Sequence, residues 1–299
     1  MAIPTVYIIC GPTAVGKTAV AIALARALGT EIVSADSRQC YDEMTIGVAK
    51  PTPEELNAVK HYFIGGISVK DPFNAADYEK LALGYLETIF ATHNEAVVCG
   101  GSGLYIKALS EGMDEMPMTD SVVAQQTEEA YKVNGLEWLQ QATAKEDPEF
   151  YKQGETQNPA RLLRALTFVR STGESIMRYR TQAPKERPFR IRKIGLDLPR
   201  ETLYDRINQR VDMMMAESLL GEVKALEPFK HLKPLQTVGY TELFGYLEGM
   251  YTLPEAVGLI KQHTRNYAKR QLTWFRKDKE VTWYAADAAG LIDRIVSEG

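Results

Sequence analysis

Short apolar runs alternate along the chain with longer amphipathic stretches. The short runs have the length and β-branched composition of strands buried on both faces, and they are residues 5–10, 31–35, 95–99 and 192–197. Apolar residues recur with helical spacing at 18–28, 75–92, 104–109, 200–226 and 254–276. Strands that alternate with helices indicate a parallel sheet flanked by helices, so we expect an α/β fold.

The pattern changes in the middle of the chain. Between residues 113 and 188 the strand signal disappears, and two stretches, 121–133 and 159–171, have helical periodicity. The strand pattern returns at 192. We therefore expect a core formed by residues 1–112 and 190–299, with a helical domain inserted at 113–189.

Composition limits the class of protein. The chain has 299 residues, of which 45% are hydrophobic and 25% charged, so it can bury a large core. No segment approaches the roughly 20 apolar residues of a membrane span, and the N-terminus enters the first strand without a signal sequence, so we expect a cytoplasmic protein. Cys10, Cys40 and Cys99 are odd in number, far apart and outside any C-x-x-C pair, which argues against disulfides and zinc.

Charge is unevenly distributed behind a net value of −4. Residues 111–149 are mainly acidic, whereas 158–193 and 261–279 are mainly basic and carry aromatic side chains such as Tyr179 and Trp274. Basic side chains mixed with aromatic ones suit a phosphate backbone and stacked bases. Because local potential matters more than total charge, the acidic balance does not exclude RNA binding.

The strongest chemical signal follows the first strand. It reads G-x-x-x-x-G-K-T and consists of Gly11, Pro12, Thr13, Ala14, Val15, Gly16, Lys17 and Thr18. In such a P-loop successive backbone N–H groups face one phosphate, the lysine adds positive charge and the threonine hydroxyl is available to Mg²⁺. The helix that follows has its positive dipole end at the phosphates. The motif predicts phosphate binding without identifying the phosphate compound.

A carboxylate follows the second strand. Ligands of an open parallel sheet collect at the carboxyl ends of its strands, so Asp36 should face the same crevice as the P-loop, where it can accept a proton. The alternative is an aspartate that only caps the strand end or shapes the turn. The third strand ends at Cys99 and Gly100, without the acidic residue that motor and switch NTPases use there. Lys17, Thr18 and Asp36 are thus the expected chemical core. Ser102, at the start of a further helix, is either a plain helix cap or a ligand contact.

Seven segments in this order closely resemble the tRNA dimethylallyltransferase family, also called tRNA isopentenyltransferases. They are GPTAVGKT, SADSRQ, GGSGLYIKAL, NPARLLRAL, LYDRINQRVDMM, VGYTELFGYLEG and AKRQLTWFRKD. The resemblance covers nearly the whole chain, and DSRQ and KRQxTWFR are its most specific parts. The family's fold is a P-loop NTPase-like parallel sheet flanked by helices, with an inserted helical domain.

The resemblance implies transfer of a dimethylallyl group from dimethylallyl diphosphate to N6 of the adenosine 3′-adjacent to the tRNA anticodon, with release of diphosphate. The P-loop and Mg²⁺, the latter at Thr18, would bind diphosphate, and Lys17 would neutralise its developing charge. Asp36 would accept or orient the N6 proton. We expect a monomer whose partners are dimethylallyl diphosphate and the anticodon stem-loop. The tRNA contacts implied are Asp36, Ser37, Arg38, Gln39, Ser102, Asn158, Pro159, Ala160, Arg161 and Leu162.

Two features depart from the family pattern, and three other functions stay open. Thr241 occupies the commonly basic position after V-G-Y, and the C-terminal zinc finger of some members is missing. An isopentenyltransferase acting on free AMP or ADP is the nearest alternative, although a mononucleotide needs no basic-aromatic insertion. A shikimate- or nucleoside-type kinase also pairs a P-loop with an acidic residue after the second strand. A non-catalytic nucleotide-binding module is the third.

Overall fold

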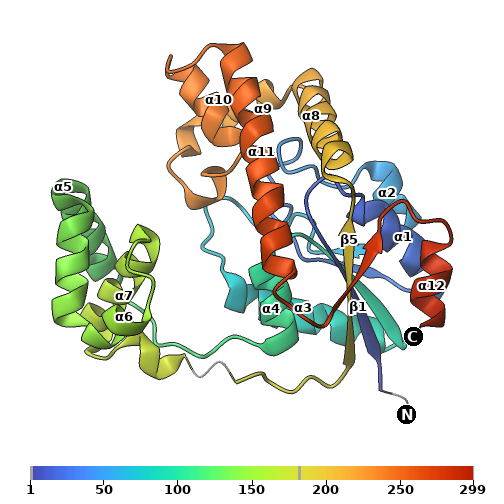
Figure 1. Cartoon of the computed structure of the whole chain (residues 1–299), viewed down its shortest axis with the longest axis horizontal. Coiled ribbons are helices and arrows are strands. Elements are labelled where there is room, and N and C mark those ends of the chain that lie inside the picture. The colour runs from blue at the N-terminus through green and yellow to red at the C-terminus, as the bar shows by residue number, and fades with distance from the viewer. Residues whose placement is uncertain (1–2, 181–182, 299) are drawn as a thin grey trace. The chain divides into compact units, whose positions relative to one another are not determined.

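The computed structural model describes residues 3–180 and 183–298 and divides the chain into two compact units. The core unit comprises Met1–Gly112 and Lys185–Gly299, and the insertion unit comprises Met113–Pro184 (Figure 1). Residues 185–189, which the sequence pattern assigned to the insertion, belong to the core unit. The Arg187 guanidinium lies 2.8 Å from the Glu79 carboxylate and also donates to the carbonyls of Ala108 and Leu109.

A six-stranded parallel sheet forms the centre of the core unit. Its order is β3-β2-β4-β1-β5-β6, so β1 lies inside the sheet between β4 and β5. The strands are β1 (Thr5–Cys10), β2 (Ile32–Ser34), β3 (His61–Tyr62), β4 (Glu95–Cys99), β5 (Arg190–Asp197) and β6 (Val281–Ala285). The predicted α/β fold is confirmed, and β3 and β6 extend it at the two edges. Because all neighbours are parallel, the chain leaves every strand at the same edge of the sheet.

Helices cover the sheet and extend beyond its edge. They are α1 (Lys17–Leu28), α2 (Pro53–Ala58), α3 (Ala75–Phe90), α4 (Gly103–Glu111), α8 (Arg200–Ala216), α9 (Leu219–Leu226), α10 (Tyr240–Leu247), α11 (Leu253–Phe275) and α12 (Leu291–Ser297) (Figure 1). Val6, Ile8 and Ile9 of β1 are fully buried, and Ile9 belongs to a cluster that also contains Leu24 of α1 and Ile295 of α12. This packing fixes the P-loop between a buried strand and a buried helix face.

The single helix expected over 200–226 is wrong. The structure breaks it into α8 and α9 at Ser218, which has a left-handed backbone with φ of 75°. The break falls at a serine, and Gly221 comes only later, inside α9, so the apolar spacing continues across the break and suggests one continuous helix. The turn lets α9 bury Leu219, Val223 and Leu226 independently of the direction of α8.

The insertion unit is helical and has its own core. It contains α5 (Ser121–Glu146), α6 (Pro148–Gln153) and α7 (Pro159–Thr172), with an interruption of α5 at Gly135. Leu139, Phe150, Leu162 and Leu166 are fully buried in one cluster. These contacts keep the unit compact by itself.

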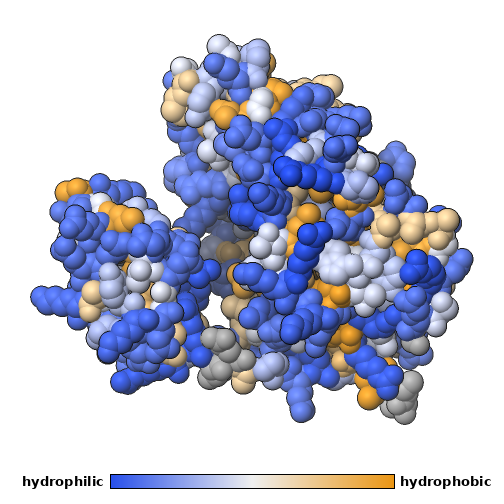
Figure 2. Space-filling view, viewed as in Figure 1, coloured by the Kyte–Doolittle hydropathy of each residue, from blue (hydrophilic) through white to orange (hydrophobic). Residues whose placement is uncertain are grey.

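The remaining surface and thiols fit the composition. The face of the molecule in Figure 2 is mainly hydrophilic, with scattered apolar side chains. Within residues 3–180 and 183–298, no helix is long and apolar enough to span a bilayer. Cys10, Cys40 and Cys99 are free thiols.

Candidate active site

The P-loop connects β1 to α1 with two glycines whose backbone other residues rarely adopt. Gly11 has φ of 141°, and a Cβ there would lie 2.6 Å from the Leu196 carbonyl oxygen of β5. Gly16 has φ of 106° and is the N-cap of α1, which has no side-chain cap. The first amides of α1 are consequently left for an anion, at the positive end of the helix dipole.

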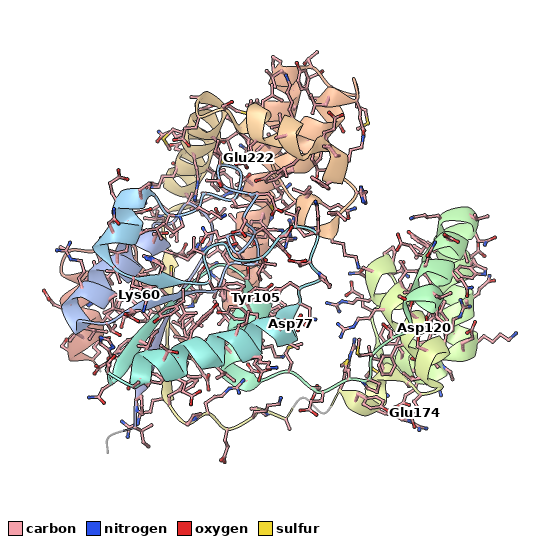
Figure 3. All side chains as sticks on the ribbon, turned by 180° about the vertical axis from the view of Figure 1, so that it is seen from behind. Lys60, Asp77, Tyr105, Asp120, Glu174 and Glu222 are labelled. Carbon is pink, nitrogen blue, oxygen red and sulfur yellow. The ribbon has the colours of Figure 1, made fainter. Side chains whose placement is uncertain are left out.

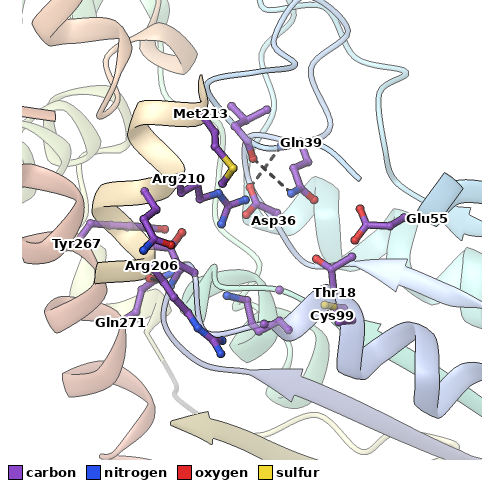
Figure 4. A pocket seen from close by; sticks show the side chains of 18 residues that line it. Thr18, Asp36, Gln39, Glu55, Cys99, Arg206, Arg210, Met213, Tyr267 and Gln271 are labelled. Carbon is purple, nitrogen blue, oxygen red and sulfur yellow. Dashed lines mark hydrogen bonds between the residues drawn. The ribbon is translucent and has the colours of Figure 1, made fainter. Parts of the chain in front are cut away.

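A cavity of 390 Å³ lies over this loop (Figure 4). It brings Lys17, Thr18 and Asp36 together, as expected from the common edge of parallel strands. Helix α8 contributes Arg206, Gln209, Arg210 and Met213, and α11 contributes Tyr267 and Gln271. The cavity is therefore closed by helices that lie more than 180 residues after the P-loop in the chain.

Lys17 is a half-buried cation in the wall of the cavity. Its Nζ donates to the Pro12 carbonyl at 2.8 Å. Burial lowers the pKa of Lys17, while the nearby Cys99 thiol and Asp36 carboxylate favour its charged form. The surrounding protein compensates the positive charge of Lys17 only in part. An anion that binds in the cavity would complete this compensation.

The two carboxylate oxygens of Asp36 differ in their hydrogen bonds. Oδ1 accepts from the backbone N–H of Arg38 at 2.8 Å and of Gln39 at 3.3 Å, so it shapes the turn after β2. Oδ2 accepts no hydrogen bond from the described residues. The carboxylate is thus oriented through one oxygen, and the residue lines the cavity.

Two arginines of α8 were missed by the sequence reasoning. Arg210 is deeply placed in the cavity, where burial lowers its pKa while Asp36 and Glu55 oppose that effect. Arg206 lies one turn earlier, and its Nη1 donates to the Val15 carbonyl at 3.3 Å. Their spacing of four residues places them on one helix face, a signal that could have identified a cationic site. Together with Lys17 they surround the P-loop with positive charge.

Gln271 of α11 connects the P-loop to the loop at residues 100–103 through hydrogen bonds. Its buried side chain accepts from the Thr13 N–H at 2.9 Å and donates to the Gly101 carbonyl, also at 2.9 Å. In the sequence, Gln271 is part of the KRQxTWFR segment, and the sequence alone predicts no role for it. The hydrogen bonds explain why an uncharged residue follows Lys269 and Arg270 there.

A second cavity of 470 Å³ shares Tyr267 and Gln271 with the first. Five aromatic and two basic residues contribute to its lining, which comprises Ser37, Arg38, Phe73, Asn74, Ala75, Gly101, Ser102, Gly103, Leu104, Tyr105, Tyr267, Arg270, Gln271, Trp274 and Phe275. The Ser102 hydroxyl accepts from the Ser37 N–H at 2.9 Å and makes no capping bond to α4. Ser102 therefore occupies the N-cap position of α4 without capping the helix through its side chain.

The remaining predicted tRNA contacts belong to the insertion unit. Asn158 caps α7 through the Ala160 N–H, and Pro159 is the first helical residue. Arg161 is exposed and pairs with Glu155 at 2.8 Å. Leu162 is fully buried, so its side chain packs inside the unit and cannot contact RNA directly.

Thr241 does not belong to either cavity of the core unit described here. It lies on α10, where its hydroxyl donates to the Thr237 carbonyl at 3.1 Å. The departure from a basic residue at this position therefore leaves the lining of both cavities unchanged.

These features define the class of the protein: an α/β phosphate-binding transferase in which a P-loop, basic side chains and a carboxylate surround one cavity. The chain belongs to the IPP transferase family, which matches residues 39–278.

Known proteins extend this similarity over the chain. This chain is 45% identical to tRNA dimethylallyltransferase 1 of Phocaeicola vulgatus, and the alignment covers 95% of this chain and 94% of that protein. For tRNA dimethylallyltransferase 1 of Bacteroides thetaiotaomicron the identity is 46%, and the coverage is 94% and 91%. The solved tRNA isopentenylpyrophosphate transferase of Bacillus halodurans is 34% identical, with a TM-score of 0.73 and coverage of 99% and 95%.

Proposed function

We propose that this chain transfers a dimethylallyl group from dimethylallyl diphosphate to N6 of the adenosine 3′-adjacent to the anticodon of tRNA. The observation that carries the proposal is the first cavity, where a cationic phosphate site and the oriented Asp36 carboxylate face the same space. The similarity to tRNA dimethylallyltransferases over nearly the whole chain supports the identity of the two substrates. We propose that the chain acts as a monomer.

The diphosphate side of the cavity stabilises the leaving group. The amides of Gly16 and Lys17 at the start of α1, with the Lys17 ammonium and the Arg210 guanidinium, would hold diphosphate oxygens. As the C1–O bond of dimethylallyl diphosphate breaks, its electron pair moves onto diphosphate. Fixed positive charge stabilises that change more in the transition state than in the substrate, and so accelerates the reaction.

On the acceptor side of the cavity, a proton must be removed from the adenosine N6. The adenosine N6 forms a bond to C1 of the dimethylallyl group and must lose one proton. Asp36 Oδ2 would accept it, while Oδ1 keeps its bonds to the turn. Base and leaving-group site line one cavity, so a substrate spanning it meets both groups.

The residues near Thr18 fit a divalent cation. The Thr18 hydroxyl and the Glu55 carboxylate line the same cavity, and oxygen ligands are those that Mg²⁺ prefers (Figure 4). In the described part of the chain there is no group of three or more His, Cys, Asp or Glu side chains suited to a metal. Diphosphate and water would therefore supply most of the ligands. When bound, Mg²⁺ would offset negative charge on diphosphate.

The second cavity suits the path of an extruded base. Ser37, Arg38 and Ser102 line it together with Tyr105 and Trp274. Unstacking an adenine from a loop costs roughly a few kcal/mol, and aromatic or guanidinium surfaces offset that cost by stacking. Gln39, which lines the first cavity, would contact the base once it reaches Asp36.

Parallel incubations test the proposed function. Labelled dimethylallyl diphosphate or γ-labelled ATP is offered with unmodified tRNA, and in separate reactions with AMP or ADP. We expect label from dimethylallyl diphosphate in tRNA only, and nuclease digestion with mass spectrometry should place it on the adenosine after the anticodon. Prenylated AMP or ADP would instead support a mononucleotide transferase, phosphate transfer from ATP would support a kinase, and binding without transfer would support a non-catalytic module.

The insertion unit should contribute to the affinity for tRNA. Arg161 and Arg164 are exposed on α7, so replacing both with alanine should weaken tRNA binding without changing diphosphate affinity. Each lost phosphate contact should flatten the slope of log affinity against log salt by about 0.7 to 0.9. Binding is measured over a salt series, with exposed Lys132→Ala on α5 as the matched charge control. An unchanged affinity and slope would assign Arg161 to its ion pair with Glu155 alone.

A further inference from the structure

Glu222 of α9 lies outside the lining of both cavities, yet its carboxylate accepts hydrogen bonds from two distant segments. Oε2 accepts from the N–H groups of Thr45 at 3.1 Å and Ile46 at 2.7 Å. Oε1 accepts from the Gly47 N–H at 3.1 Å and from the Tyr240 hydroxyl at 2.5 Å. Figure 3 shows Glu222 where α9 meets these loops. The two oxygens thus join the turn 45–47 to helix α10.

The turn 45–47 is built around this carboxylate. Three consecutive backbone N–H groups converge on it, an arrangement that forms an anion-binding concavity. Glu222 makes no ion pair with the described residues, so these amides and the Tyr240 hydroxyl stabilise its charge. Tyr240 is fully buried, and a Cβ at Gly47 would lie 2.6 Å from its ring. The turn therefore packs directly on the aromatic side chain that shares Glu222.

The same segment continues to the active site. The side-chain amide of Gln39 donates to the carbonyls of Ala49 at 2.8 Å and Val48 at 3.4 Å. Val48 and Gln39 both line the first cavity. The Gln39 N–H in turn donates to Asp36 Oδ1. A continuous path of hydrogen bonds and one short chain segment thus leads from Glu222 to the carboxylate that faces the acceptor.

We propose that Glu222 is a positioning residue for prenyl transfer. It fixes the turn 45–47, which holds Gln39 through the carbonyls of residues 48–49, and Gln39 helps fix Asp36 Oδ1. The inference rests on the proposed function, because it concerns the alignment of the group that takes the N6 proton. It assigns a role to α9 and α10, whose Glu222 and Tyr240 contact neither cavity directly.

Glu222→Gln is the decisive variant. It keeps size and shape, but its amide group is a donor where the carboxylate accepted from backbone N–H groups, so the turn must shift. A small displacement of a reacting group slows chemistry strongly, and we expect the single-turnover transfer rate to fall about 10- to 100-fold. Affinities for dimethylallyl diphosphate and tRNA should change little, because among the described residues Glu222 makes its hydrogen bonds to Thr45, Ile46, Gly47 and Tyr240 and none to the P-loop. Glu248→Gln, which removes an exposed charge on the neighbouring helix end, is the matched control.

A double-mutant cycle separates positioning from stability. If Glu222 acts through Gln39, then Gln39→Ala and Glu222→Gln should be strongly non-additive in the transfer rate. Tyr240→Phe leaves the three amide bonds in place and should slow transfer less; it provides the test if Glu222→Gln does not fold. A lowered melting temperature with an unchanged transfer rate per folded molecule, or fully additive effects, would overturn the inference. Absence of transfer by the wild-type protein would contradict the proposed function itself, so the two failures are distinguishable.

Discussion

Lys17→Ala is expected to slow dimethylallyl transfer by about 100-fold or more while the fold survives. Removing one donor that stabilises developing charge in a water-poor site typically has an effect of this size. Lys17 is half-buried beside the P-loop, and its Nζ makes a hydrogen bond only to the Pro12 carbonyl among the described residues. The alanine variant therefore leaves no buried charge behind. Steady-state prenylation measured beside thermal unfolding tests the prediction.

The pH dependence of diphosphate binding provides an independent check on Lys17. Burial lowers its pKa in the free protein, and bound diphosphate should raise it again. The contribution of Lys17 to affinity is then complete below the lowered pKa and decreases as pH rises through it. This part of the pH dependence should vanish in Lys17→Ala. Near-wild-type turnover in a folded variant would remove Lys17 from the mechanism.

The sequence predicted the parts of the site that depend on local pattern and on a general rule of parallel sheets. The P-loop is contiguous, and its strand and helix are both recognisable from apolar spacing. Asp36 could be placed beside it because the ends of parallel strands share one edge, and the order β2-β4-β1 puts a single strand between them. Ser102 lies at the same edge after β4, although its hydrogen bond to Ser37 was not foreseen.

The walls of the cavity could not be predicted in the same way. Arg206, Arg210 and Gln271 come from helices whose orientation is set by tertiary packing. The spacing of Arg206 and Arg210 indicates a cationic helix face, but not that this face lies against the P-loop. The break at Ser218 is not predicted because the left-handed residue is a serine and the apolar spacing continues across it, with Gly221 inside the following helix. It nevertheless determines where Glu222 points, since α9 follows that turn directly. Leu162 was misread because a family segment contains packing residues as well as contacts.

Asp36→Asn is the variant that isolates proton transfer from structure. Asparagine keeps an oxygen acceptor that can take the place of Oδ1 and receive the N–H groups of Arg38 and Gln39, so the turn after β2 should persist. What is lost is the basicity of the second oxygen. The single-turnover rate at saturating tRNA should fall by about 10²- to 10⁴-fold, the usual contribution of general base catalysis. Affinity for tRNA should change little.

The alanine variant supplies the contrast. Asp36→Ala loses both the base and the bonds that orient residues 38–39, so it should slow transfer and also disturb the path of the extruded base past Arg38. Filter binding of tRNA should then be weaker for Asp36→Ala than for Asp36→Asn, while both transfer slowly. A binding defect in Asp36→Asn with an unchanged rate at saturation would assign Asp36 to substrate positioning. A slow rate with intact binding would assign it to the N6 proton, because asparagine keeps the oxygen that orients the turn and loses the charge and basicity of the second oxygen.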